Sequence, residues 1–336
     1  MPISRLSLAA ILTGLAATGA ALAEPVAVTV DNFDRAETNE IMKSYVGVAG
    51  IGEWVHNRAP TPIDQQNVVR MNRDTLYSFA VVDMSTPVTI VKPESDRFQS
   101  MLLINEEHSM LPAIHEDGTF TIPPSLVGTR YLAVVIRTFA DPNDPEDVKA
   151  ANALQDQLQI IQPDKGAFEI PDWEPESLAR VRDAIKVLGN TRSDTTPYFG
   201  QKALLNPLYH LIGTAVGWGG NPPEAAMYTL GLVPNNDGTP YTVTAKDVPV
   251  DGFWSVTVYN AQGFMEANDM GVYSYNNVTA KPNADGGYTI NFGGCADGRI
   301  NCIPIMQGWN YAIRLYQPRA EILDGTWRFP DFQPAG

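Results

Sequence analysis

The residues best suited to chemistry lie in the segment 72–77, which reads NRDTLY. If a strand begins near Asp74, the side chains of Asp74 and Tyr77 point to opposite faces of that strand. Asp74 could act as a carboxylate base or ligand, Asn72 as an amide donor, and Tyr77 could supply a phenol at the same site. The alternative is that Asn72 and Asp74 hydrogen-bond the backbone of the turn before the strand, while Arg73 pairs locally. Catalysis by Asp74 and Tyr77, ligand binding by Asn72 and Arg73, and simple turn capping all stay open.

The chain has only four histidines, so little acid–base chemistry can rest on imidazole. His108 and His115 flank a strand-like segment, 109–114, and both have acidic neighbours. Such a set could bind a metal, and His108 could serve as a general acid or base. Their separation matches no compact metal signature, however, and the polar clusters are also typical of turns. We therefore expect no bound metal, and we expect His56 and His210 to be helix residues.

Aromatic residues crowd the last third of the chain and offer a different kind of site. In the segment 253–259, FWSVTVY, the even-numbered residues have the pattern of core. The odd-numbered residues, from Phe253 to Tyr259, could line a groove for an apolar or glycan ligand, as could Trp218. Core packing explains most of these aromatics equally well.

Several reaction classes lack their sequence signatures in this chain. There is no G-x-S-x-G elbow, phosphate loop, G-x-G-x-x-G after a strand, or H-E-x-x-H motif. The sequence therefore speaks against standard serine hydrolases, nucleotide enzymes and zincins, and we expect no cofactor. A non-covalent carboxylate mechanism stays open.

The net charge limits the kinds of partner that the protein can bind. The 336 residues contain 23 Lys and Arg against 38 Asp and Glu, a formal net charge of −15. Polyanion binding needs a cationic footprint, so we expect neither nucleic acid nor anionic membrane surfaces as partners. A hydrophobic share of 44% is enough for a globular core.

The N-terminus indicates export. Residues 1–23 combine Arg5, an uncharged Leu- and Ala-rich run, and a small-x-small ending, which is the pattern of a secretory signal peptide. The alternative is a membrane anchor, for which this run is short and weakly apolar. We expect cleavage after Ala23, a periplasmic or secreted protein, and no membrane span thereafter.

Cys295 and Cys302 are the two cysteines of the chain. An exported protein can keep a disulfide, and the glycine-containing loop between them can close one. Two free thiols or a metal pair are the alternatives, but no histidine lies nearby to complete a metal site. We expect a local disulfide.

The texture of the sequence alternates between β and helical regions. In residues 37–56 the spacing of the apolar residues places them on about one face of a helix, so we expect a helix there. Short runs of β-branched and aromatic residues fill 75–139, and similar runs return from about residue 237 to the last one, TWRFP at 326–330. This pattern is typical of antiparallel β-sandwiches. Between them, apolar spacing predicts a helix that runs from Asp144 to Ile161. Capping residues predict further helix starts at Glu174-Pro175, Asn206-Pro207 and Asn221-Pro222.

Motifs in both β regions resemble two families. Residues 66–78 (QNVVRMNRDTLYS) and 96–101 (DRFQSM) are similar to the N-terminal domain of unknown function 1254, DUF1254. Segments that resemble the C-terminal domain of unknown function 1214, DUF1214, are 253–259 (FWSVTVY), 314–318 (RLYQP) and 323–327 (LDGTW). Residues 217–228 (GWGGNPPEAAMY) resemble the usual connector between the two.

The resemblance implies a mainly β protein with an immunoglobulin-like first sandwich, a central helical segment and a jelly-roll-like second sandwich. The expected divisions are a signal peptide (1–23), an N-terminal helical segment (24–60), the DUF1254 sandwich (61–140), a helical insert and connector (141–230) and the DUF1214 sandwich (231–336).

The resemblance implies no established reaction. We expect an exported ligand-binding or scaffold protein with a pocket between its two sandwiches, which takes a small-molecule or polymer ligand. We also expect self-association, because open sandwiches leave edges to cover. The alternative is a hydrolase or lyase that uses Asp74 and Tyr77, with His108, on an extracellular substrate.

Overall fold

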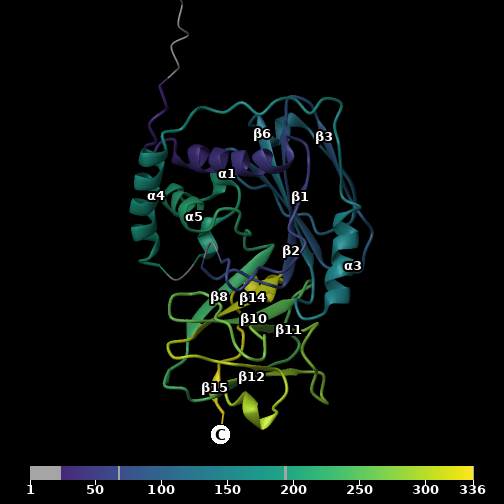
Figure 1. Cartoon of the computed structure of the whole chain (residues 1–336), viewed down its shortest axis with the longest axis vertical. Coiled ribbons are helices and arrows are strands. Elements are labelled where there is room, and N and C mark those ends of the chain that lie inside the picture. Colours follow the sequence, from purple (N-terminus) through teal and green to yellow (C-terminus); the bar gives the residue numbers. More distant parts are fainter. Residues whose placement is uncertain (1–23, 67–68, 193–194, 336) are drawn as a thin grey trace, which may run out of the picture.

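The computed structural model describes residues 24–66, 69–192 and 195–335 (Figure 1). These residues form six α-helices and four open β-sheets, so the prediction of a mainly β protein with helical segments is confirmed. The predicted signal peptide, residues 1–23, lies outside the described residues. The described chain up to α5 (Pro207–Gly217) forms the upper part of Figure 1, and the chain from β8 (Ala226–Leu232) onwards forms the lower part. We call these two parts the first half and the second half.

The largest sheet of the first half has the strand order β1-β2-β6-β4, and every neighbouring pair is antiparallel. Its strands are β1 (Val55–His56), β2 (Thr75–Asp83), β4 (Gln99–Asn105) and β6 (Tyr131–Phe139). β6 is buried at every position, which explains its nearly continuous apolar sequence. His56 lies in β1, so its predicted place in a helix is wrong.

Helices cover one face of this sheet and a smaller sheet covers the other. Alternate residues of β2 and β6, such as Phe79 and Val135, pack against the helices, whereas Val82 and Val134 pack against the smaller sheet. Figure 1 shows the helices together on one side of the sheet. They are α1 (Phe33–Ala49), α4 (Pro175–Gly189) and α5 (Pro207–Gly217). The smaller sheet consists of β3 (Val88–Lys92), β5 (Gly118–Ile122) and β7 (Gln159–Ile161).

Capping residues start two of the helices as predicted. The side chain of Asp144 accepts a hydrogen bond from the backbone N–H of Glu146 at the start of α3 (Pro145–Gln155). Asn206 caps α5 in the same way. α3 ends at Gln155 and the chain then enters β7, so the prediction of a helix to Ile161 is wrong. Two further helices of one turn are α2 (Pro124–Val127) and α6 (Ala320–Leu323).

The second half contains two four-stranded sheets that share one hydrophobic core. The sheet nearer the first half has the order β11-β10-β14-β8, with β8 (Ala226–Leu232), β10 (Trp254–Tyr259), β11 (Ser274–Asn276) and β14 (Asn310–Tyr316). The other has the order β13-β12-β9-β15, with β9 (Tyr241–Ala245), β12 (Tyr288–Phe292), β13 (Cys302–Ile303) and β15 (Gln333–Pro334).

In the second half and the turn before it, two predicted elements are wrong and the predicted disulfide is confirmed. The predicted helix start at Asn221 is a turn that leads into β8, and residues 326–330 form no strand. Cys295 and Cys302 form the predicted disulfide. None of the helices in the described part of the chain combines the length and the apolar character needed to cross a membrane. The immunoglobulin-like and jelly-roll topologies stay predictions.

Candidate functional site

Polar side chains from both halves meet where the sheet of β2 and β6 approaches the sheet of β10 and β14. We call this set the interface cluster. Its members are Asn72, Asp74, Tyr77, Arg137, Arg314 and Tyr316. Asn72, Asp74 and Tyr77 were predicted as site residues, and the structure brings them together.

Asp74 is fully enclosed, with 0% of its surface exposed. Ser255 Oγ donates to Asp74 Oδ2 at 2.7 Å, and Asn276 Nδ2 donates to Asp74 Oδ1 at 3.4 Å. Both donors belong to the second half of the chain. Burial raises the pKa of Asp74, although the charge of Arg314 and the two donors act in the opposite direction. The carboxylate thus joins the two halves and does not cap the turn before β2.

Asn72 forms the turn cap and also links two phenols. Its Oδ1 accepts from the backbone N–H of Asp74 at 3.2 Å, as the capping alternative predicts. Its Nδ2 donates to Tyr77 Oη at 3.1 Å and to Tyr316 Oη at 3.4 Å. One amide therefore brings a phenol from each half of the chain to the same point.

The pKa values of the two phenols shift in opposite directions. Burial and the nearby Asp74 raise the pKa of Tyr316 well above its usual value, so it stays protonated. Burial also acts to raise the pKa of Tyr77, but the neighbouring Arg137 guanidinium outweighs it and holds the pKa below its usual value. Tyr77 keeps part of its surface exposed, whereas Tyr316 is enclosed.

Arg137 lies directly across from Tyr77 in the β2–β6 register, with its guanidinium 5.4 Å from the centre of the Tyr77 ring. Its Nη2 donates to the carbonyl oxygen of Gly219 at 2.6 Å, while its buried Nη1 has no hydrogen-bond partner. Only 6% of Arg137 is exposed. Sequence reasoning missed this residue, although a single charge in the apolar strand YLAVVIRTF was a usable signal.

Arg314 is the second buried cation, and the protein itself satisfies it. Nη1 donates to Thr257 Oγ1 at 2.9 Å, and Nη2 donates to Tyr259 Oη and to the carbonyl oxygen of Arg70, both at 2.7 Å. Burial acts to lower the pKa of Arg314, but Tyr259, Tyr316 and Asp74 outweigh it, and the net shift is upwards. Arg314 therefore holds the second half of the chain against the segment that precedes β2.

The two aromatic residues predicted to line a groove are enclosed at the interface. Tyr259 is 0% exposed and its hydroxyl donates to the carbonyl oxygen of Met71 at 2.8 Å. Phe253 is 1% exposed and packs edge-on against Phe98 and Phe139, with ring centres 5.1 and 4.9 Å away. Their proposed role in ligand binding stays a prediction that requires the two halves to separate.

Arg73 and Trp218 lie apart from the interface cluster. Arg73 donates to the carbonyl oxygen of Thr61 and lies 5.5 Å from the ring of Tyr273. Trp218 Nε1 donates to Thr38 Oγ1 at 2.9 Å. Both side chains already have partners, and their roles in ligand binding stay predictions.

His108 is an enclosed, neutral imidazole on the helical side of the large sheet. Its Nε2 accepts from the backbone N–H of Gly219 at 3.0 Å, so the proton lies on Nδ1, 2.8 Å from Thr214 Oγ1. Burial holds the pKa of His108 well below its usual value. Because Gly219 also accepts from Arg137, the imidazole positions the residue that binds this guanidinium.

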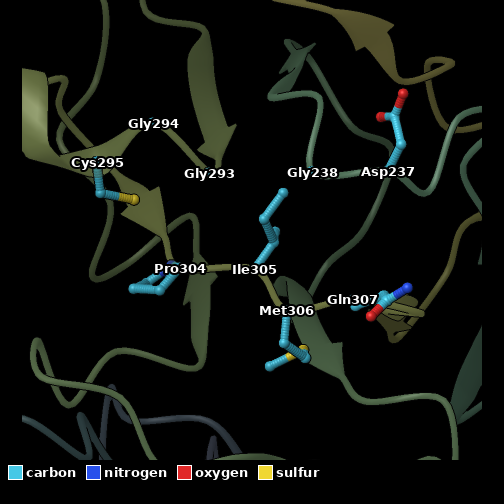
Figure 2. A pocket seen from close by; sticks show the side chains of 9 residues that line it. All are labelled: Asp237, Gly238, Gly293, Gly294, Cys295, Pro304, Ile305, Met306 and Gln307. Atoms are coloured by element: carbon cyan, nitrogen blue, oxygen red, sulfur yellow. The ribbon is translucent and has the colours of Figure 1, made fainter.

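The described residues contain no group of three or more His, Cys, Asp or Glu side chains placed to hold a metal ion. A pocket of about 620 Å³ lies in the second half of the chain, beside the disulfide (Figure 2). Its lining comes from loops and from the start of a one-turn 3-10 helix, Cys295–Asp297, and includes Asp237, Gly293, Cys295 and Met306. It contains no residue of the interface cluster, and of the predicted site residues it includes Cys295.

Two family models match segments of the chain, and Arg137 is the one residue of the interface cluster that lies in neither segment. Residues 51–119 match the family described as protein of unknown function DUF1254, and residues 232–320 match protein of unknown function DUF1214. Asn72, Asp74 and Tyr77 fall in the first match and Arg314 and Tyr316 fall in the second. No functionally curated protein matches the sequence.

Two solved structures are similar to this chain, and the first of them shows the same fold. The VPA0106 protein from Vibrio parahaemolyticus is 18% identical, with a TM-score of 0.66 over 91% of this chain and 100% of that chain. An uncharacterized protein from Burkholderia cenocepacia is 16% identical, with a TM-score of 0.48 over 90% of this chain and 88% of that chain. The first of these likenesses concerns the fold alone.

Proposed function

Because this chain combines the DUF1254 and DUF1214 families, both of unknown function, in that order, we propose its function from the interface cluster. The protein is an exported ligand-binding protein whose binding site lies between its two halves, at Asn72, Tyr77 and Arg137. The observation that carries this proposal is the buried Arg137 guanidinium, which has an unpaired nitrogen beside partly exposed polar side chains.

Access to the site is graded from the outside inwards. Asn72, Tyr77 and Tyr228, a residue of β8 that packs in the same aromatic group as Tyr316, keep part of their surface exposed, whereas Asp74 and Tyr316 are enclosed. A ligand would therefore meet the amide and the phenols before the guanidinium. A few polar groups that converge among aromatic rings are typical of small-molecule sites.

Binding is favoured over catalysis because of the position of Asp74. A general base must reach a substrate proton directly or through one water molecule. Asp74 is enclosed and both of its oxygens accept hydrogen bonds from the second half of the chain. His108, the other predicted acid or base, is likewise enclosed.

A hydrolase or lyase remains the second candidate, and one observation favours it. The pKa of Asp74 is raised and that of Tyr77 is lowered, so the two values move towards each other. Groups perturbed in this way gather at catalytic sites. The enzyme proposal requires the halves to open so that Asp74 can meet substrate.

The test is a thermal-shift screen of a small-molecule and oligosaccharide library against the protein that begins at Glu24. Hits should raise the melting temperature of the wild type, and their affinity should fall at least 10-fold in Tyr77→Phe, which removes only the hydroxyl. Tyr275→Phe is the matched control, because Tyr275 packs in the core of the second half. Hits that bind Tyr77→Phe as well as the wild type would contradict the proposed site.

Turnover separates the two candidate functions. Each hit is incubated with the wild type and with Asp74→Asn, and its loss is followed by mass spectrometry. Hits that stay intact support binding. A hit that the wild type consumes and the folded Asp74→Asn variant leaves intact would establish the enzyme instead.

Export and self-association belong to the same proposal. We expect the mature protein in the periplasm or outside the cell to begin at Glu24, after a signal peptide that spans residues 1–23. Open sheet edges favour pairing of two copies. N-terminal sequencing and light scattering of the exported material test the two points.

A further inference from the structure

Arg137 is a buried cation without a counter-charge. Among the described residues no carboxylate forms an ion pair with it, and only 6% of its surface is exposed. The acid of the interface cluster, Asp74, accepts hydrogen bonds from Ser255 and Asn276 and acts on Arg314. A buried charge is costly when it lacks a partner of opposite sign. The site therefore lacks a negative charge to balance Arg137.

Hydrogen-bond donors near Arg137 are also unused. Arg137 Nη1 has no acceptor in good hydrogen-bond geometry, although the guanidinium lies close enough to the Tyr77 phenol to lower its pKa, and Nη2 is occupied by Gly219. Tyr77 and Tyr316 both accept from Asn72, and no described residue accepts a hydrogen bond from either hydroxyl. Donors that converge without acceptors favour a ligand that supplies acceptor oxygens.

We infer that the site binds the carboxylate group of a small molecule, with one oxygen on Arg137 Nη1 and the other within reach of the Tyr77 hydroxyl. This inference rests on the proposed function and names the chemical class of its ligand. A carboxylate supplies the missing negative charge and two acceptor oxygens, and charge-assisted hydrogen bonds to guanidinium are strong. A phosphate dianion fits less well, because Arg314 already spends its donors on protein groups.

Isothermal titration with small probes tests the inference. Formate, acetate and benzoate are compared with benzamide, which has the shape of benzoate without its charge, and with inorganic phosphate. We expect at least one carboxylate to bind the wild type at least 10-fold more tightly than benzamide and phosphate. We expect Arg137→Gln to lose at least 10-fold in affinity for that carboxylate.

Arg180→Gln is the matched control, since Arg180 is exposed on α4 and its loss changes the net charge by the same amount. It should bind like the wild type. Circular dichroism checks the fold of each variant. If Arg137→Gln does not fold, Tyr77→Phe and the comparison of benzoate with benzamide still decide the question.

Three results would overturn the inference. They are benzamide binding as tightly as benzoate, phosphate binding more tightly than every carboxylate, and no carboxylate binding that depends on Arg137. A neutral library hit whose affinity falls in Tyr77→Phe would then leave the proposed function standing, with a different ligand class. The absence of any Tyr77-dependent hit would instead remove the proposed function itself.

Discussion

Asp74 illustrates at the residue scale how neighbours decide what a side chain can do. Its position before an apolar strand suggested either a catalytic base or a turn cap. In the structure Asn72 caps the turn, and the Asp74 carboxylate accepts from Ser255 and Asn276 instead. The same carboxyl group thus has a structural task that no local pattern indicates.

The histidines show a second residue-scale effect. All four have lowered pKa values, and burial is the largest cause for each. His115 is the clearest case, since both of its ring nitrogens are buried without a hydrogen-bond partner and its pKa falls to about 4. The unfolded chain therefore binds more protons than the folded protein between about pH 6.5 and pH 4.

We predict from this that folded-state stability decreases as the pH falls from about 6.5 towards 4, and that His115→Phe reduces the decrease. The variant loses the titratable group and can keep the ring contact with Phe98, whose centre is 5.7 Å away. Urea denaturation at several pH values between 4 and 7.5 measures the effect. Parallel pH profiles for the variant and the wild type would contradict the assignment to His115.

At the scale of elements, local signals predicted where helices begin better than where they end. Asp144 and Asn206 cap α3 and α5 because a cap acts through the nearest backbone N–H groups. The end of α3 at Gln155 follows instead from β7, whose pairing partner β3 lies some 70 residues earlier. An element that depends on a distant partner has no complete local signature.

Two glycines in helices provide an element-scale prediction. A Cβ at Gly213 in α5 would lie 2.6 Å from the carbonyl oxygen of Tyr198, whereas a Cβ at Gly47 in α1 would meet nothing within 4 Å. Gly213→Ala should lower the free energy of unfolding by about 1–3 kcal/mol through overpacking. Gly47→Ala should raise it by about 0.5–1 kcal/mol through the helix propensity of alanine.

Chemical denaturation of both variants measures these changes. The pair serves as its own control, because the substitution is the same and only the surroundings differ. Equal effects at the two positions would show that the close approach of α5 to Tyr198 does not limit the packing.

At the scale of the whole molecule, one interface joins the two halves through apolar and polar contacts. Phe253 stacks on Tyr316 with ring centres 4.2 Å apart and also packs edge-on against Phe98 and Phe139 from the first half. Beside these rings lies Asp74 with its two donors. Such an interface favours unfolding of both halves as one unit.

We predict that Ser255→Ala weakens this coupling. Asp74 Oδ2 would stay buried without its 2.7 Å donor, and we expect a loss of about 1–3 kcal/mol in the free energy of unfolding. Ser85→Ala, in an exposed turn, is the control and should change stability by less than about 0.5 kcal/mol. Calorimetry should show one transition for the wild type and a lower, broader one for Ser255→Ala. An unchanged transition would mean that Asp74 contributes little across the interface.

Only part of the candidate site could be predicted from the sequence, because the site combines residues that are far apart along the chain. Asn72, Asp74 and Tyr77 stand in one short motif, so their residue types alone drew attention to them. Arg137 and Tyr316 are far from that motif along the chain, and strand pairing and domain packing bring them to it. A single Arg in an apolar strand was a signal, but it named no partner.

The sequence by itself determined the properties that depend on composition and near neighbours. These include the negative charge, the β texture, the capped helices, the two family motifs and the short disulfide loop. Tertiary structure decided which of the chemical groups meet. Ser255 lies 181 residues from Asp74, and no local pattern encodes a contact over that separation. Burial in the folded state, not residue type, leaves Arg137 without a counter-charge and makes it the centre of the proposed site.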